Sequence, residues 1–68
     1  MQWISVSSTR MAAVAHNNQT KIMYIRFHDE AVWYYADVNE TQFKAFMSSP
    51  SLGRALNSFQ RGRRYGRT

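Results

Sequence analysis

The stretch KIMYIRFHDEAVWYYADV, residues 21–38, determines the fold that we predict for this chain. Apolar side chains alternate with other side chains on both sides of a short polar interruption, as they do in two half-buried β-strands. β-Branched and aromatic residues, which favour strands, make up much of both runs. The stretch is therefore predicted to form a β-hairpin.

The register of this hairpin decides which side chains share a face. A three-residue turn over residues 29–31 would pair His28 with Val32 and Arg26 with Tyr34. A slip by one residue would move the whole hydrophobic set to solvent. The predicted core face carries Met23, Ile25, Phe27, Trp33 and Tyr35.

The opposite face of the hairpin carries Tyr24, Arg26 and Tyr34. Two tyrosines beside an arginine are suited to stacking on nucleic-acid bases. The same residues would also make an ordinary solvated face with a cross-strand aromatic pair. The sequence leaves these two interpretations open.

Two segments before the hairpin are also predicted to be extended, and the second of them adds a strand to the sheet. Residues 2–6 are expected to form a short extended segment that packs Trp3 or Ile4 over the core. Residues 11–16 are followed by a polar turn and are interpreted as a strand. The prediction is a three-stranded antiparallel meander over residues 10–36.

A short helix is predicted directly after the meander. Asn39 is a good N-cap, and Gln42 lies three residues later in the position of a capping box. Glu40 in the first turn suits the positive end of the helix dipole. We expect this helix over about residues 40–48, with its aromatic stripe buried on the sheet.

A second short helix follows, with Ser49 and Pro50, or alternatively Ser51, at its start. Its amphipathic stripe is Leu52, Ala55, Leu56 and Phe59. The predicted fold class is thus α+β, a three-stranded antiparallel β-meander followed by two short α-helices packed on one face. Residues 1–60 are expected to form the single domain, and residues 61–68 a basic, arginine-rich C-terminal tail.

Length and composition limit the class of protein. The chain has 68 residues and no cysteine, so its core is small and no disulfide or thiolate metal site is available. Stability is expected to come from aromatic packing or from a partner subunit, for example in a weak homodimer. The N-terminus does not resemble a signal peptide, and no apolar run approaches the ~18 residues of a membrane span. We therefore predict a cytoplasmic protein without membrane contact.

Charge is concentrated at the C-terminal end. Nine basic and four acidic residues give a formal net charge of +5. Residues 1–53 hold four of each sign, so the entire excess lies in residues 54–68, where every basic residue is an arginine. Arginine binds phosphate through its planar fork and stacks on bases. This block indicates an anionic partner, with nucleic acid as the first candidate.

Four short motifs follow one another along the chain. Residues 6–9 (VSST) are followed by the apolar strand that ends at Phe27, by residues 33–35 (WYY), and by residues 51–57 (SLGRALN). In this order they resemble the KTSC domain, a short bacterial and phage-associated module named from the C-terminus of some lysyl-tRNA synthetases. The family pattern opens with V-x-S-S and continues through Y-x-Y to S-x-G-R-Y-F-N. Here tryptophan replaces the first tyrosine, and alanine and leucine replace the Tyr-Phe pair.

The resemblance covers roughly residues 5–65. It implies an α+β fold with a small antiparallel sheet and two helices. It implies no established activity, and RNA binding is indicated only by the synthetase context.

The sequence shows no pattern of catalytic or metal-binding residues. His16 and His28 are the two histidines, and neither has a cysteine or a close carboxylate at metal-ligand spacing. The acidic pair Asp29 and Glu30 lies in a predicted turn rather than in a pocket. The glycines do not form a phosphate-binding loop after a strand. We predict a non-enzymatic protein with no cofactor and no metal.

Two binding functions remain, together with a tail that only keeps the chain soluble. The first function is an RNA- or single-stranded nucleic-acid-binding module. The second is a protein-interaction module, such as a phage-encoded protein that docks on and modulates a host or phage protein. The candidate contact residues are Arg54, Arg61, Arg63, Arg64, Tyr65, Arg67, Tyr24, Arg26 and Tyr34.

Overall fold

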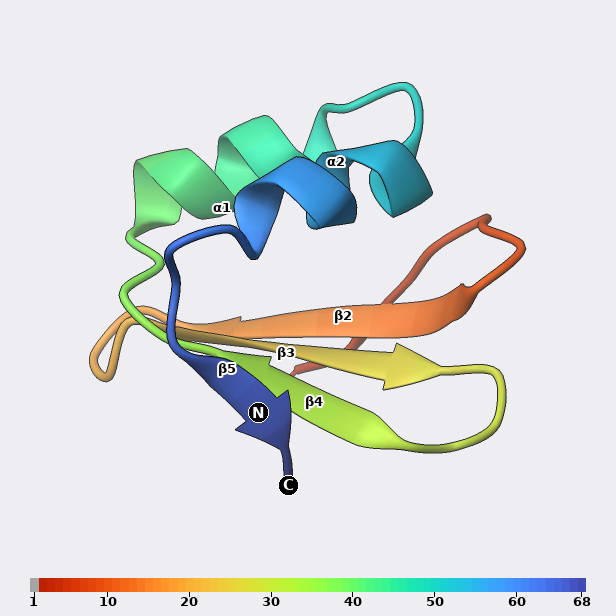
Figure 1. Ribbon diagram of the computed structural model, residues 1–68, viewed down its shortest axis with the longest axis horizontal. Helices are drawn as coiled ribbons and strands as arrows, with labels where there is room; N and C mark the ends of the chain where they lie inside the picture. Colours follow the sequence, from red (N-terminus) through yellow and green to blue (C-terminus); the bar gives the residue numbers. More distant parts are fainter. Residues whose placement is uncertain (1) are drawn as a thin grey trace.

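The computed structural model describes residues 2–68 and shows a five-stranded antiparallel sheet with two helices against one of its faces (Figure 1). The strands lie side by side in the order in which they occur in the chain. They are β1 (Ile4–Ser5), β2 (Met11–Asn17), β3 (Ile22–Phe27), β4 (Val32–Tyr35) and β5 (Tyr65–Arg67). The helices are α1 (Glu40–Met47) and α2 (Leu52–Phe59). No helix in residues 2–68 has the length and apolar character needed to cross a membrane.

The α+β class with two helices and an antiparallel sheet is confirmed, but the prediction of three strands is wrong. Strands β2, β3 and β4 are the predicted meander, and β1 and β5 extend it at its two edges. The C-terminal segment predicted as a tail contributes β5, which hydrogen-bonds along β4. Ala36 N–H donates to Arg64 O at 2.9 Å and Thr68 N–H donates to Val32 O at 2.9 Å. Pairing satisfies backbone groups of β4 that would otherwise form a free edge.

The turn between β3 and β4 begins one residue earlier than predicted, which shifts the pairing of the two strands by two residues. Phe27 N–H donates to Ala31 O at 2.9 Å, so the three turn residues are 28–30, and Arg26 pairs with Val32. Glu30 ends the turn at φ 70°, a left-handed conformation usual for the third residue of such hairpins. A shift by two residues leaves every side chain on its predicted face because the side-chain period of a strand is two.

The core lies between the sheet and the helices. Its buried members are Met11, Val14, Met23, Ile25, Tyr35, Val38, Phe46 and Leu56. Phe27 and Trp33, which were predicted as core residues, are only partly buried at its margin. The strands therefore bury their large side chains most completely where both helices cover them.

Helix ends follow the predicted capping chemistry. Asn39 Oδ1 accepts from Gln42 N–H at 2.8 Å and Gln42 Oε1 accepts from Asn39 N–H at 3.0 Å, which confirms the capping box at α1. Ser51, rather than Ser49, is the N-cap of α2. Beyond the end of α2, Gly62 has φ 67°, which glycine adopts without steric cost, and the chain turns back towards the sheet.

Candidate functional site

The sheet face that the helices leave uncovered is called the open face below. The observed strand pairing and the two-residue alternation assign its side chains. They are Trp3, Ser5, Ala13, Ala15, Asn17, Ile22, Tyr24, Arg26, Val32, Tyr34 and Gly66. None of these positions holds an acidic residue, so the open face combines aromatic groups with positive charge.

Arg26 crosses the open face from β3 to the segment before β1. Its Cζ lies 5.0 Å from the centroid of the Trp3 ring, within the range of a cation–π contact. Strand β2 lies between these two residues, and Ala13 is the β2 residue paired with Arg26. Ala13 is only 1% exposed although no helix covers this face. A small residue on β2 therefore lets the arginine side chain lie along the sheet.

Tyr34 lies over a small residue in the same way. A Cβ placed on Gly66 would be 3.2 Å from Tyr34 Cε1 and 3.4 Å from the Tyr34 hydroxyl oxygen. The Tyr34 ring therefore lies over the backbone of β5. Tyr24 is the cross-strand partner of Tyr34 on one side and of Ala15 on the other. Ala15 is completely buried under larger neighbours, and Ala13 is almost completely buried.

The open face is built in the same way throughout, with aromatic side chains lying over small residues. Its aromatic residues Trp3, Tyr24 and Tyr34 are partly buried, neither fully exposed nor part of the core. Small residues on β2 and β5 leave room for them above the sheet. Such held side chains lose little rotational freedom when a ligand ring stacks on them, because the protein has already restricted it.

Two of the predicted contact residues lie on the helix-covered face instead. Tyr65 pairs with Tyr35 and Arg67 pairs with Trp33, so both have the opposite orientation from Gly66. The Tyr65 and Tyr35 rings stack with centroids 5.6 Å apart. The structure therefore separates Tyr65 from Tyr24 and Tyr34, with which the sequence grouped it.

Arg63 is used in folding contacts. Its Nη1 donates to Ala36 O at 2.9 Å and to Asp37 O at 2.6 Å, and its Nε donates to Phe59 O at 3.0 Å. Its guanidinium also lies 4.1 Å from the centroid of the Phe59 ring. Arg63 thus ties the C-terminal end of α2 to the end of β4, where a cation also suits the helix dipole.

The remaining arginines of the C-terminal block are exposed but scattered. Arg54 is on α2, and Arg61 is in the turn after this helix. Arg64 directly precedes β5, and alternation from Gly66 places it towards the open face. The block that is continuous in sequence is therefore not one surface. Arg64 is its member closest in orientation to Tyr24, Arg26 and Tyr34.

Trp3 is the open-face residue that the sequence prediction missed, since Trp3 or Ile4 was expected over the core. Ile4 is 45% exposed, and Val6 is the residue of this segment that packs against the core. Strand β1 has only two residues, too few to show which side chains point inwards. The signal that was available is the pair Ala13 and Ala15, small residues that leave space above β2.

The two histidines make local contacts. His16 Nε2 lies 2.7 Å from Val38 O, and its ring stacks on Phe43 at a centroid distance of 4.7 Å. His28 Nε2 lies 2.8 Å from Ser8 O. Within residues 2–68, no three His, Cys, Asp or Glu side chains are grouped so that they would hold a metal ion.

Comparisons with known proteins agree on the fold. The profile of the KTSC domain matches residues 7–65. The crystal structure of a KTSC domain protein from Yersinia pestis superposes with a TM-score of 0.88, at 25% sequence identity, over 98% of this chain and 96% of that chain. Among curated proteins, none matches the sequence.

Proposed function

The chain belongs to the KTSC domain family, and we propose that it binds single-stranded nucleic acid, RNA in the first place, through the open face of its sheet. The observation that carries this proposal is the set of aromatic side chains Trp3, Tyr24 and Tyr34 over small residues on a face without acids. Antiparallel sheets with exposed aromatic residues are a common means of binding unpaired bases.

Bases would stack on Tyr24, Tyr34 and the free surface of Trp3. Stacking on an aromatic side chain contributes ~1–3 kcal/mol per base and depends little on the identity of the base. The guanidinium of Arg26 rests over Trp3 and keeps N–H groups available for phosphate. Arg64 supplies a second cation on the same side of the sheet.

Fluorescence anisotropy with labelled oligouridylate and the matching single-stranded DNA tests the proposal. Tyr34→Ala and Tyr24→Ala should each weaken binding by about tenfold, the loss of one stacked base. Tyr65→Ala, which removes a tyrosine from the other face, should leave the affinity close to that of the unchanged protein. Equal losses in all three variants would contradict an open-face site.

Salt dependence measures how many arginines contact phosphate. Contacts by Arg26 and Arg64 alone correspond to a slope of about −1.4 in a plot of log affinity against log salt concentration. Contacts by all five arginines of residues 54–68 would give about −3.5. Lys44→Gln on α1 is the control for the general effect of removing a cation. A slope near zero would exclude phosphate contacts.

A protein partner is the other outcome of this experiment. The edge strands β1 and β5 have two and three residues, which limits pairing with a strand of another protein. If no oligonucleotide binds even at low salt, the aromatic open face would instead be tested for docking of a protein, by affinity capture after nuclease treatment.

A further inference from the structure

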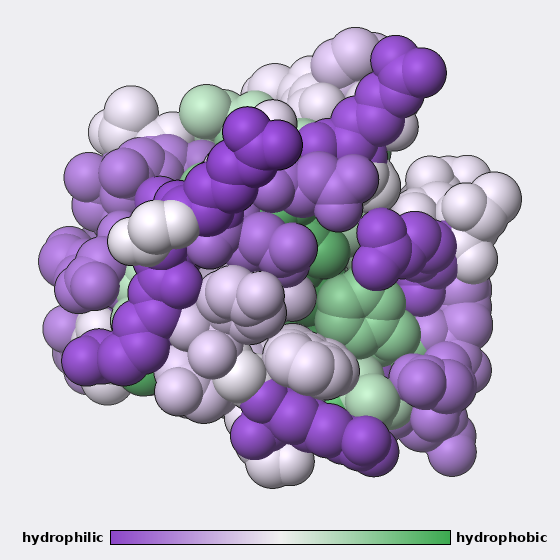
Figure 2. Space-filling model, viewed as in Figure 1, coloured by the Kyte–Doolittle hydropathy of each residue, from purple (hydrophilic) through white to green (hydrophobic). Residues whose placement is uncertain are grey.

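A cleft opens on the helix-covered side of the sheet, at the end where Phe27 and Trp33 are only partly buried. It lies between α2 and the hairpin end of β3 and β4, and its volume is about 490 Å³. Small-molecule sites commonly have ~300–1,000 Å³. Figure 2 shows a hydrophobic hollow between the helices and the sheet with hydrophilic groups around it.

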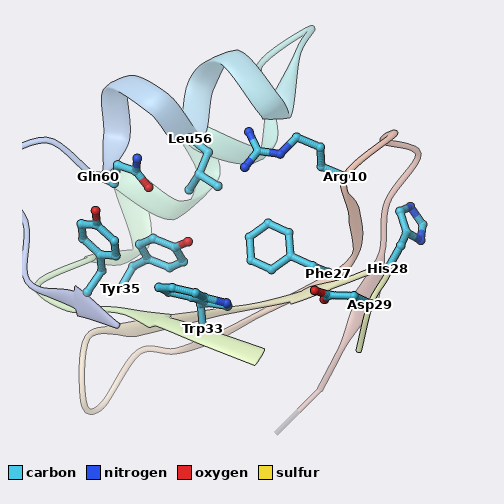
Figure 3. A pocket seen from close by; sticks show the side chains of 9 residues that line it. Arg10, Phe27, His28, Asp29, Trp33, Tyr35, Leu56 and Gln60 are labelled. Atoms are coloured by element: carbon cyan, nitrogen blue, oxygen red, sulfur yellow. The ribbon is translucent and has the colours of Figure 1, made fainter. Parts of the chain in front are cut away.

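Aromatic side chains form much of the cleft. The rings of Trp33 and Tyr65 are 6.4 Å apart and tilted by 35°, and the Tyr65 ring stacks on Tyr35. Phe27 lies on the far side of the space from Tyr35 (Figure 3). Tyr65 is 43% exposed, so part of its ring remains accessible from the cleft. The cleft thus offers a wall on which a flat ring can stack.

Polar groups stand around this wall. Arg10 reaches the cleft from the loop before β2, and Gln60 reaches it from the end of α2 (Figure 3). Within residues 2–68, no carboxylate lies within 4.0 Å of the Arg10 guanidinium, and the single ion pair joins Lys44 to Glu40. Asp29 also lines the cleft, but its Oδ1 accepts a hydrogen bond from Ala31 N–H at 3.0 Å and its carboxylate forms no ion pair with Arg10, which leaves the Arg10 guanidinium open to an anionic ligand. Bidentate binding of a phosphate or carboxylate is the interaction that best fits its geometry.

The hydroxyl of Tyr35 adds a hydrogen-bond donor inside the cleft. It points into the open space in Figure 3 and has no hydrogen-bond partner among residues 2–68. Burial, and next the proximity of Tyr65, raise the pKa of Tyr35 to about 12, against an opposing effect of Arg10. The hydroxyl therefore keeps its proton at physiological pH and is available as a donor.

We propose that this cleft binds a small ligand that joins a planar ring to an anionic group. The ring stacks on Trp33 and Tyr65, the anionic group binds Arg10, and Tyr35 and Gln60 hydrogen-bond to the polar atoms between them. Two sources share this chemistry, a mononucleotide and an aromatic carboxylate. The site is separate from the open face because it lies on the other side of the sheet.

The two tryptophans of the chain allow each site to be observed alone. In a Trp3→Phe variant the remaining tryptophan is Trp33, which lines the cleft. In a Trp33→Phe variant the remaining tryptophan is Trp3 on the open face. Adenosine monophosphate, uridine monophosphate and phenylacetate are titrated into both variants, and tryptophan fluorescence is recorded.

The proposal expects a saturable change of Trp33 fluorescence with at least one of these probes and no change of Trp3 fluorescence. A response to the nucleotides alone identifies a nucleotide site, and a response to phenylacetate alone identifies a carboxylate site. Adenosine and 2-phenylethanol lack the anionic group, so each should bind at least about tenfold more weakly than its anionic counterpart. No saturable response of Trp33 through the millimolar range would overturn the proposal.

Variants at the cleft test the assigned roles. In the Trp3→Phe background, Arg10→Gln should weaken binding about tenfold, and Tyr35→Phe should weaken it severalfold without altering the packed ring. Lys44→Gln, on the exposed side of α1, is the matched control and should bind as the parent does. Unchanged affinity in both Arg10→Gln and Tyr35→Phe would overturn the assignment. Circular dichroism verifies that each variant is folded, and oligonucleotide anisotropy measured separately distinguishes this result from failure of the open-face proposal.

Discussion

The two faces of the sheet use the same strands in opposite ways. On the helix-covered face, large side chains such as Ile25 and Met23 are completely buried under α1 and α2. On the open face, the completely buried residue is small, as at Ala15, and the large side chains lie partly exposed above it. One face therefore stabilises the fold, and the other presents aromatic groups to solvent.

The difference shows how a chain of 68 residues supports both a core and a face of partly exposed aromatic rings. A small domain buries a limited fraction of its surface, so few large side chains can remain outside the core without loss of stability. Here the exposed rings are placed over alanine and glycine, where they still remove some apolar surface from water. Four changes would test this separation of roles, beginning with the largest expected effect.

The largest difference in stability is expected between substitutions at two adjacent residues of β3. Ile25→Ala should lower the free energy of unfolding by ~2–5 kcal/mol because it leaves a cavity in the core. Tyr24→Ala, one position away, should cost about 1 kcal/mol or less but should weaken oligonucleotide binding. Urea denaturation followed by circular dichroism measures both costs. Similar losses of stability in the two variants would mean that the open face is also part of the core.

The pH dependence of stability should report the burial of Tyr35. Its pKa is raised from 10.0 to about 12 in the folded protein. Below pH 10 the folded and unfolded states both keep the proton, and the stabilisation is complete. Between pH 10 and 12 the unfolded state loses the proton while the folded state retains it, so stability falls as pH rises.

Comparison with Tyr35→Phe isolates this contribution, since the two proteins differ only in the Tyr35 hydroxyl. The difference in unfolding free energy between the two proteins should change across pH 10–12 and stay constant from pH 7 to 9. A constant difference over the whole range would show that the Tyr35 hydroxyl titrates normally.

Gly66→Ala should affect the open face more than the core. The new Cβ would meet Tyr34 Cε1 at 3.2 Å, so the ring must move by a few tenths of an ångström. We expect binding to oligouridylate to weaken by about two- to fivefold, a part of the energy of one stacked base. Stability should change by less than ~1 kcal/mol because alanine is favoured over glycine in a strand. Unchanged affinity would mean that the position of Tyr34 over β5 does not matter for binding.

The smallest effect is expected at the β3–β4 turn, away from both faces. Glu30 has φ 70°, which is costly for any residue with a Cβ, so Glu30→Gly should stabilise the protein by ~0.5–1 kcal/mol. Asp29→Gly is the control and should destabilise it, because Asp29 Oδ1 accepts a hydrogen bond from Ala31 N–H at 3.0 Å. Thermal denaturation distinguishes the two. Loss of stability in Glu30→Gly would contradict the strain at this position.

The family profile confirms the resemblance that short motifs indicated. Local sequence patterns also predicted the positions of several strands and helix ends. Alternation located β3 and β4, and the polar turn after residue 16 located β2. The pair of Asn39 and Gln42 located the start of α1. These features depend on residues within a few positions of one another. The β3–β4 turn was predicted one residue too late because no glycine marks it, and Glu30 takes the left-handed conformation instead.

Local sequence patterns could not predict the edge strands of the sheet or which candidate site residues share a face. Strands β1 and β5 have two and three residues, so neither shows a period, and each forms because a neighbour offers free backbone groups. The arginines of residues 54–68 form one block in sequence, yet Arg63 binds backbone carbonyls and Arg67 lies on the opposite face from Gly66.

By itself, the sequence determined the α+β class, the central hairpin with its two faces, and the concentration of arginine near the C-terminus. These follow from the periods of strand and helix and from composition, which are local properties. Tertiary structure alone decided that Trp3 joins Arg26 across β2, that Tyr34 lies over Gly66, and that Tyr65 belongs to a cleft with Trp33 and Tyr35. Each of these contacts joins residues far apart in the chain, and pairing of the strands brings them together.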